Sequence, residues 1–312
     1  MSKTDIIEIS NLIKVYKQKN IEVIALRGVD LKVQREEILG IMGPSGSGKT
    51  TLLNQIGAID RPTGGIIISC GKDLSKLNDN ELTSYRRFDV GFVFQEFNLS
   101  PVLTAEENIR LPMKLTKKLT AEEQKLKARE LLKRVNLSSR ANHKPDELSG
   151  GEKQRIALLT AIVNEPRILI ADEPTGELDS ETSTEILELL KELQSEYGLT
   201  CVIVTHNQLV SRITDRVLQL ADGRIKGTYK LNITDTEEPE TPSFEFDAGI
   251  ALKHLYPPRT CENCQNNEFD YQEPSEGPEI YARSSSGMIS VQMGFGICKK
   301  CNHISWGFSP TR

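Results

Sequence analysis

The sequence contains no apolar run long enough to cross a lipid bilayer. A transmembrane helix needs about 20 consecutive apolar residues, and no stretch of this 312-residue chain approaches that length. The first ten residues, MSKTDIIEIS, also lack the apolar run of a signal peptide. We therefore expect the protein to stay in the cytosol, where thiols are kept reduced.

An excess of positive charge is missing as well. The formal net charge is −5, and the chain has the apolar and charged content of a soluble globular protein. A basic balance is the usual electrostatic mark of a nucleic-acid-binding protein. The totals therefore give no support for nucleic acid as a partner.

Three regions of different composition follow one another along the chain. Residues 1–230 alternate apolar runs with amphipathic stretches, a pattern typical of an α/β domain. Residues 231–256 are interpreted as an acidic linker, because the stretch 231–250 holds six Asp or Glu, no Lys or Arg, and two prolines. Residues 257–312 carry four of the six cysteines and are predicted to form a small separate domain.

Local patterns predict the secondary structure of the first region. Continuous apolar runs typical of strands buried on both faces occur in EEILGIMG, VGFVFQ, RILIADE and TCVIVTH. The stretch 104–164 is expected to be mostly helical, with an interruption near NHKPDELSGG, and it contains two TAEE capping boxes. A further helix is expected over 180–197, with Gly198 at its end.

The segment GPSGSGKT, residues 43–50, matches the phosphate-binding motif G-x-x-x-x-G-K-[ST] at every fixed position. It follows an apolar strand and precedes a helix, which is the context that the motif requires. The glycines let backbone N–H groups face the phosphates, the Lys49 ammonium reaches their oxygens, and the Thr50 hydroxyl ligates Mg²⁺. The expected nucleotide-binding residues here are Gly43, Ser45, Gly46, Ser47, Gly48, Lys49, Thr50 and Thr51.

Two adjacent carboxylates end the strand in RILIADE. Such a pair more often begins a solvated loop, but a phosphate loop in the same chain favours a catalytic interpretation. We expect Asp172 to hold the magnesium shell and Glu173 to polarise an attacking water.

The segment LSGGEKQR, residues 148–155, is a second anion-binding device, with a serine and two glycines at a helix start. By itself it would be only a well-capped helix. Because the chain already has a phosphate loop, this device needs a different phosphate. A head-to-tail pair of protomers, each offering this segment to the nucleotide of the other, is the simplest arrangement.

Together these segments resemble the ATPase cassette of ABC transporters across residues 5–230. The resemblance rests on GPSGSGKTT, Gln95 in VFQEFN, LSGGEKQR, ILIADEPTGELD and His206 in IVTHN. The stretches around Gln95 and Glu173 look most like the subgroup that powers lipoprotein release, macrolide export and the cell-division complexes. The resemblance implies a P-loop ABC fold, with a mixed-sheet core and a helical subdomain.

The same resemblance implies a function. The chain would be an ATP-hydrolysing subunit that dimerises around two ATP molecules and drives a separate integral membrane permease. It would lie on the inner face of the cell membrane, with the stretch 95–113 against the permease. The alternative is a soluble ABC ATPase acting on nucleic acid or ribosomes, which the single uninterrupted cassette disfavours.

Roles for single residues also follow from the resemblance. Tyr16 would stack on adenine, Gln95 would touch magnesium and the attacking water, and His206 would hold the γ-phosphate and orient Glu173. Without the resemblance, these three would be interpreted as a core aromatic, a buried strand cap and a structural histidine. The residues expected to reach the partner protomer's nucleotide are Ser149, Gly150, Gly151 and Asp179.

One departure from the subgroup is Thr160, which stands where arginine is expected, and a second is GELD in place of Gly-Asn-Leu-Asp. Neither change removes a catalytic group.

The last region contains two Cys-x-x-Cys pairs, CENC and CKKC, with 33 residues between them. Two such pairs can hold one tetrahedral zinc ion, which would stabilise a segment poor in aliphatic side chains. The expected zinc ligands, in a zinc-ribbon-like domain, are Cys261, Cys264, Cys298 and Cys301. Two disulfides or a redox dithiol are the alternatives, both disfavoured in this context. Cys70 and Cys201 lie in strand-like runs and are expected to be buried apolar residues.

Overall fold

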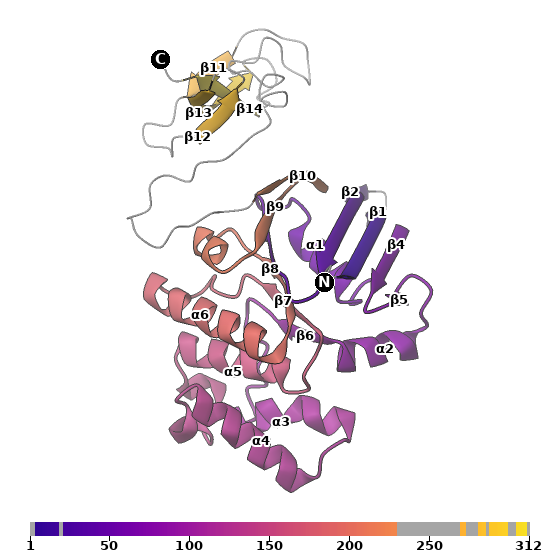
Figure 1. Cartoon of the computed structure of the whole chain (residues 1–312), viewed down its shortest axis with the longest axis vertical. Helices are drawn as coiled ribbons and strands as arrows, with labels where there is room; N and C mark the ends of the chain where they lie inside the picture. The colour runs from indigo at the N-terminus through magenta and orange to yellow at the C-terminus, as the bar shows by residue number, and fades with distance from the viewer. Residues whose placement is uncertain are drawn as a thin grey trace. The chain divides into compact units, whose positions relative to one another are not determined.

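The computed structural model describes residues 4–18, 21–229, 269–272, 280–284, 287–298 and 304–310. The chain divides into two compact units, Met1–Leu231 and Asn232–Arg312. Figure 1 shows the elements of each unit, and they are described separately below. Among the described residues, no helix combines the length and apolar character that crossing a membrane requires.

The first unit is built on a six-stranded sheet with the order β10-β9-β3-β8-β7-β6. Its strands are β3 (Ile38–Met42), β6 (Val90–Val93), β7 (Ile168–Asp172), β8 (Thr200–Val204), β9 (Arg216–Ala221) and β10 (Arg224–Tyr229). All neighbouring pairs are parallel except β9 and β10. The four predicted apolar runs become β3, β8, β7 and β6, four consecutive strands of this sheet. That prediction is confirmed.

A second sheet of the same unit is antiparallel, with the order β2-β1-β4-β5. Its strands are β1 (Asp5–Gln18), β2 (Ile21–Gln34), β4 (Gly64–Ser69) and β5 (Lys72–Asp73). One face of this sheet packs against α1 (Lys49–Ile56) and the six-stranded sheet, so that Ile7, Ile41 and Leu52 belong to one core. Helix α2 (Asp79–Phe88) adds Leu82 and Tyr85 to the same core. The apolar side chains that point into this core stabilise the unit by about 1.5–3 kcal/mol each relative to exposure.

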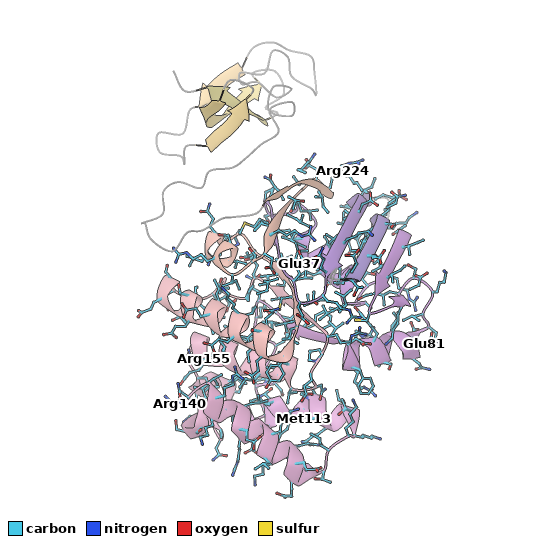
Figure 2. The ribbon with its side chains drawn as sticks, in the orientation of Figure 1. Glu37, Glu81, Met113, Arg140, Arg155 and Arg224 are labelled. Carbon is cyan, nitrogen blue, oxygen red and sulfur yellow. The ribbon has the colours of Figure 1, made fainter. Side chains whose placement is uncertain are left out.

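The other helices surround a second core. They are α3 (Ala105–Thr116), α4 (Ala121–Arg134), α5 (Gly150–Ile162) and α6 (Ser180–Tyr197), with 3₁₀ turns at Ser138–Arg140, Pro145–Glu147 and Gln208–Arg212. Figure 1 shows α3, α4 and α5 gathered together, and the buried Met113 labelled in Figure 2 belongs to the core that they share. The ion pair between Arg140 and Glu152, 2.8 Å long, fastens the turn after α4 to α5.

The helix boundaries follow the signals in the sequence. The Thr104 and Thr120 hydroxyls each accept a hydrogen bond from the backbone N–H of the glutamate three residues later. The side chain of that glutamate accepts one from the threonine N–H, so both predicted capping boxes are confirmed. The helix predicted over 180–197 is α6, and Gly198 ends it in the left-handed conformation with φ 60°.

Cys70 and Cys201, the two cysteines outside the predicted zinc site, differ in burial. Cys201 is fully buried in β8, as expected. Cys70 is not in a strand: it follows β4 in a turn with φ 51° and is only half-buried. The prediction for Cys70 was wrong because the turn into β5 begins one residue earlier than the apolar run suggests.

The described residues of the second unit form four antiparallel strands. They are β11 (Phe269–Gln272), β12 (Ile280–Ser284), β13 (Gly287–Cys298) and β14 (Ile304–Pro310). Strand β13 pairs with each of the other three, and it covers the predicted strand GMISVQMGFG. Three of the expected zinc ligands, Cys261, Cys264 and Cys301, lie outside the described residues. So does the side chain of Cys298, whose backbone ends β13.

Candidate functional site

The phosphate loop connects the end of β3 to the start of α1. A Cβ on Gly43 would lie 2.0 Å from the Leu220 carbonyl oxygen, and one on Gly48 would lie 2.6 Å from that of Ala25, so the loop packs tightly on its inner side. A Cβ added to Gly46, which has φ 77°, would meet no atom within 4 Å. The loop is therefore open where the backbone turns outward, which fits an anionic ligand at that place.

Lys49 lies across this loop. Its ammonium donates hydrogen bonds to the carbonyl oxygens of Gly43 (2.9 Å) and Pro44 (3.0 Å). Among the described residues, no carboxylate oxygen lies within 4.0 Å of this ammonium as an ion-pair partner. In the described residues the lysine charge thus has no carboxylate in direct contact, and phosphate oxygens would supply a close anionic partner.

The other polar side chains of the loop also differ in burial between its inner and its outer side. Ser47 is buried, and its hydroxyl has no hydrogen-bond partner among the described residues. Ser45 and Thr50 are exposed, while Thr51 is half-buried in the first turn of α1.

The end of β7 places Asp172 beside Thr50. The Thr50 hydroxyl is near enough to the Asp172 carboxylate to affect its pKa. Burial raises the pKa of Asp172, and the neighbouring Glu173 adds to this, whereas Thr50 and Lys49 oppose it. A hydroxyl and a carboxylate side by side are oxygen ligands of the kind that Mg²⁺ prefers, so these two residues fit the predicted magnesium site.

Glu173 is held from the end of β8. Its backbone has φ 47°, unusual for a residue other than glycine, and its N–H donates to the Val204 carbonyl oxygen at 2.8 Å. One carboxylate oxygen, Oε2, accepts hydrogen bonds from the Thr205 hydroxyl (2.9 Å) and the His206 backbone N–H (3.3 Å). The other, Oε1, lies 2.9 Å from Nδ1 of His206.

This arrangement fixes a carboxylate while leaving its imidazole neighbour accessible. The Glu173 side chain is 13% exposed, whereas that of His206 is 74% exposed. The structure thus brings together the two residues that the sequence analysis paired. Sequence reasoning missed Thr205, although its place directly before His206 at a strand end was the signal that could have found it.

Two further predicted residues border the same region. Gln95 follows β6 and is exposed, and its side-chain nitrogen would be 3.8 Å from a Cβ on Gly176, three residues after Glu173. Tyr16 lies on β1 and is 40% exposed. The alternative interpretations, of Gln95 as a buried strand cap and of Tyr16 as a core aromatic, are both wrong, because neither side chain is buried.

The segment 148–155, which was predicted to bind an anion, packs against the start of α6. Ser149 caps α5 and exchanges hydrogen bonds with Glu152. Asp179 caps α6 through the Thr182 backbone N–H at 2.9 Å. A Cβ on Gly151 would lie only 2.6 Å from the Thr182 methyl group, so the two helix starts are in close contact.

The two helices are also joined by an ion pair between Arg155, labelled in Figure 2, and Glu185 at 3.0 Å. Within the described part of the chain, no hydrogen bond or ion pair connects either helix start to the phosphate loop. Ser149, Gly150, Gly151 and Asp179 are thus grouped with one another and not with the chain's own Lys49.

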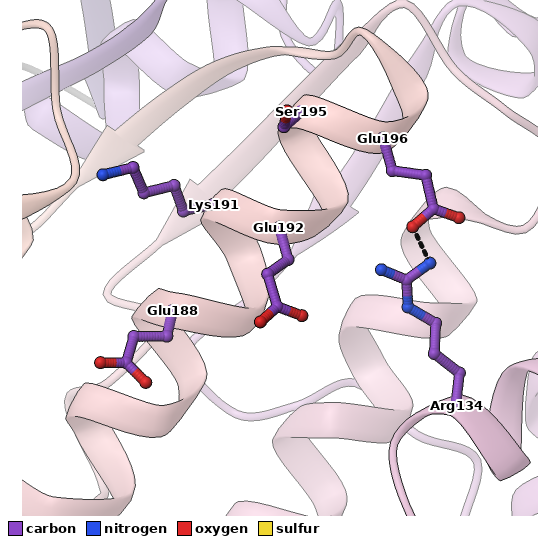
Figure 3. A pocket seen from close by; sticks show the side chains of 6 residues that line it. All are labelled: Arg134, Glu188, Lys191, Glu192, Ser195 and Glu196. Atoms are coloured by element: carbon purple, nitrogen blue, oxygen red, sulfur yellow. Dashed lines mark ion pairs between the residues drawn. The ribbon is translucent and has the colours of Figure 1, made fainter.

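A pocket of about 640 Å³ lies apart from all these residues, between α4 and α6. Figure 3 shows its charged lining and the ion pair between Arg134 and Glu196. Glu188, Glu192 and Glu196 recur every four residues along α6, as on a solvated helix face. None of the predicted site residues lines this pocket, so it is not the nucleotide site.

Comparison with known proteins identifies the family. The sequence model of the ABC transporter family matches residues 26–176. The ABC transporter ATP-binding protein MJ0796 of Methanocaldococcus jannaschii is 46% identical over 228 residues, which are 72% of this chain and 97% of that protein. The lipoprotein-releasing system ATP-binding protein LolD 2 of Caulobacter vibrioides is 42% identical over 71% of this chain and 96% of its own length.

Solved structures agree with the sequence comparison. A dimeric structure of the MJ0796 cassette in a post-hydrolysis state, bound to ADP and Pi, has a TM-score of 0.68 and 44% identity. It covers 73% of this chain and is itself covered completely. Because relatives this similar match along almost their whole length, and the phosphate loop and its carboxylates have the expected places, the chain belongs to the ABC transporter family as one of its ATP-hydrolysing cassettes.

Proposed function

We propose that this protein is the ATP-hydrolysing subunit of an ABC-type membrane transporter or mechanotransmission complex, and that it works as a dimer. ATP binding closes two cassettes around two nucleotides, and hydrolysis reopens them. The observation that carries the proposal is the Glu173 carboxylate, which three groups at the end of β8 fix directly after the magnesium-side Asp172.

In this proposal the site residues have distinct roles. The Lys49 ammonium binds the β- and γ-phosphate oxygens. Thr50, Asp172 and Gln95 would hold Mg²⁺, which when bound neutralises part of the phosphate charge. Glu173 accepts a proton from the attacking water, and Thr205 and His206 hold its carboxylate in place.

The partner cassette completes the site. Ser149, Gly150, Gly151 and Asp179 contact the nucleotide held by the other protomer. Their separation from the chain's own phosphate loop supports this arrangement, as does the dimeric structure of the similar MJ0796 cassette.

The permease is proposed to bind a groove between α2, α3 and α5, which includes Pro112 from the stretch 95–113 that was expected to lie against it. This groove has a volume of about 330 Å³, and its lining includes Arg87 on α2, Leu115 on α3 and Thr160 on α5. Leu115 is 57% exposed, so a partner in the groove could bury it. A permease that buries Leu115 would anchor the cassette at the inner face of the cell membrane.

We expect Leu115→Glu to lower recovery of the permease at least about tenfold, since a buried charge at an interface anchor is costly. The measurement is a pull-down of integral membrane proteins from detergent-solubilised membranes of the source organism. Leu126→Glu is the matched control, because Leu126 is 63% exposed on α4 and lies outside the groove.

Equal recovery with the two variants would contradict binding in the groove. Nuclease-sensitive sedimentation with ribosomes, in place of membrane-protein capture, would instead support the soluble ATPase that acts on nucleic acid or ribosomes.

We further propose that the chain has three parts, the cassette over 1–230, an acidic linker over 231–256 and a zinc-ribbon-like domain over 257–312. The four cysteines Cys261, Cys264, Cys298 and Cys301 would ligate one structural Zn²⁺. The antiparallel strands that pair with β13 support the ribbon, because β13 ends at Cys298, the first cysteine of the CKKC pair.

Purified protein is expected to contain one Zn²⁺ per chain, measured by elemental analysis. Cys264→Ser should lower the zinc content several-fold, because a three-thiolate site binds far more weakly. Cys70→Ser, which changes a half-buried thiol of the cassette, should leave the zinc content unchanged. Less than about half an equivalent of zinc in gently purified wild-type protein would refute the site.

A further inference from the structure

Asp60, in the loop after α1, connects three groups that are far apart in the sequence. Its Oδ1 accepts a hydrogen bond from the Lys14 ammonium (2.7 Å) and another from the Arg61 backbone N–H (2.8 Å). Its Oδ2 accepts one from the Tyr16 hydroxyl (3.0 Å). Both oxygens of this carboxylate are therefore used inside the protein.

Lys14 is unusually buried for a lysine, with 9% of its surface exposed. Besides Asp60, its ammonium donates to the Arg61 carbonyl oxygen at 2.8 Å and lies 4.9 Å from the centre of the Tyr16 ring. Lys14 and Tyr16 are two residues apart on β1 and so project from the same face of the strand. The buried charge is thus balanced by a carboxylate, a carbonyl and an aromatic ring.

These contacts hold the Tyr16 side chain at two places. The hydroxyl is fixed by Asp60, and Lys14 covers one face of the ring. Tyr16 is still 40% exposed, so part of its side chain remains accessible to a ligand. Burial raises the pKa of Tyr16 and Thr51 opposes that rise, so the ring stands near the first turn of α1, which follows the phosphate loop.

The charge on Asp60 is maintained at neutral pH. Burial alone would raise the pKa of Asp60, but the hydrogen bonds from Lys14 and Tyr16 outweigh that effect and leave the pKa below its usual value.

We infer that Lys14 and Asp60 are positioning residues that hold the Tyr16 ring ready to stack on the base of a bound nucleotide. This inference rests on the proposed role of Tyr16 in nucleotide binding. A ring that is already fixed loses little side-chain freedom when the base arrives, so more of the stacking energy contributes to affinity. Neither residue touches the phosphates in this arrangement, so the effect should concern the base alone.

The test compares the affinity for ATP, which has a base, with that for inorganic triphosphate, which has none. Dissociation constants for ATP and for inorganic triphosphate, both with Mg²⁺, are measured by calorimetry on the full chain. We expect Tyr16→Ala to weaken ATP binding about tenfold. Lys14→Met and Asp60→Asn should weaken it about threefold or more by freeing the ring. Binding of triphosphate should be unchanged in all three variants.

Two further variants separate positioning from folding. Tyr16→Phe keeps the ring and removes only the hydroxyl that Asp60 holds, so it should resemble Asp60→Asn. Lys17→Met removes an exposed charge from the same strand, one that pairs with Glu22 at 2.8 Å, and should behave like wild type. In a Tyr16→Ala background, Lys14→Met should have no further effect on ATP affinity.

Several outcomes would overturn the inference. Equal loss of ATP and triphosphate binding in the Lys14 and Asp60 variants would mean a structural role, and no loss of either would mean that the ring needs no support. If Tyr16→Ala binds ATP normally while Lys49→Ala does not, stacking is wrong although the nucleotide site stands. If wild-type protein binds neither ligand, the proposed function itself fails.

Discussion

Glu173→Gln is expected to lower steady-state ATP turnover by about 10²–10⁴-fold, the usual contribution of a general base. The amide keeps the size of the side chain and can still accept a hydrogen bond from Thr205, so ATP binding should be retained. What the amide cannot do is take the proton of the attacking water. With ATP and Mg²⁺, the variant should therefore accumulate as an ATP-bound dimer, detected by size-exclusion chromatography.

Glu177→Gln is the matched control for this change. Glu177 is exposed in the same loop, four residues further along, and is not among the residues that surround Glu173. Its variant should hydrolyse ATP at the wild-type rate and should not accumulate as a dimer. Normal turnover by Glu173→Gln would show that another group activates the water.

Lys49→Ala, unlike Glu173→Gln, should lose ATP binding itself, with affinity lowered about 100-fold or more. Charge-assisted hydrogen bonds to phosphate are among the strongest in proteins, and Lys49 is the cation that the loop itself supplies. Without tight binding, the variant should remain monomeric in the presence of ATP. Calorimetry with ATP measures the affinity, and size-exclusion chromatography the state of association.

Lys49 also bonds the carbonyl oxygens of Gly43 and Pro44, so its loss could disturb the loop itself. Lys49→Met keeps the apolar stem and serves as a second variant. Thermal unfolding curves equal to that of wild type would assign the lost affinity to the missing charge. Retained ATP affinity in both folded variants would contradict the assignment of residues 43–50 as the phosphate-binding loop.

The sequence was most informative where one segment carries its own complete signal. Strands β3, β7 and β8 are buried on both faces, which requires the continuous apolar runs that predicted them. Helix α6 has a capping aspartate at one end and a left-handed glycine at the other, so both of its boundaries could be predicted.

Prediction was weaker where an element is only half-buried or where partners are distant. The long hairpin of β1 and β2 has a polar face and several register shifts, and no short pattern marks it. The contacts of Asp60 with Lys14 and Tyr16 join residues 44–46 positions apart. Nothing in the sequence around Lys14, Tyr16 or Asp60 indicates that they pair. Only the packed fold shows that these three side chains meet.

Helix α5 could transmit a displacement from one end of the cassette's helical part to the other. Its 13 residues span about 20 Å at 1.5 Å per residue. Its first turn carries Gly151, which packs against Thr182 of α6, and its last turn reaches the groove through Thr160. Just beyond the helix, the Asn164 amide donates to the Pro112 carbonyl oxygen of α3 at 3.2 Å.

A helix without an internal proline or glycine beyond its first turn bends little, so α5 would act as a stiff rod between these two ends. When the partner's nucleotide pulls on the first turn, the displacement would reach the wall of the groove without a joint in between. Helix α5 alone would then connect the nucleotide site to the permease. Substitutions that make its central turns flexible should uncouple ATP hydrolysis from transport, while nucleotide binding at one end and permease binding at the other remain.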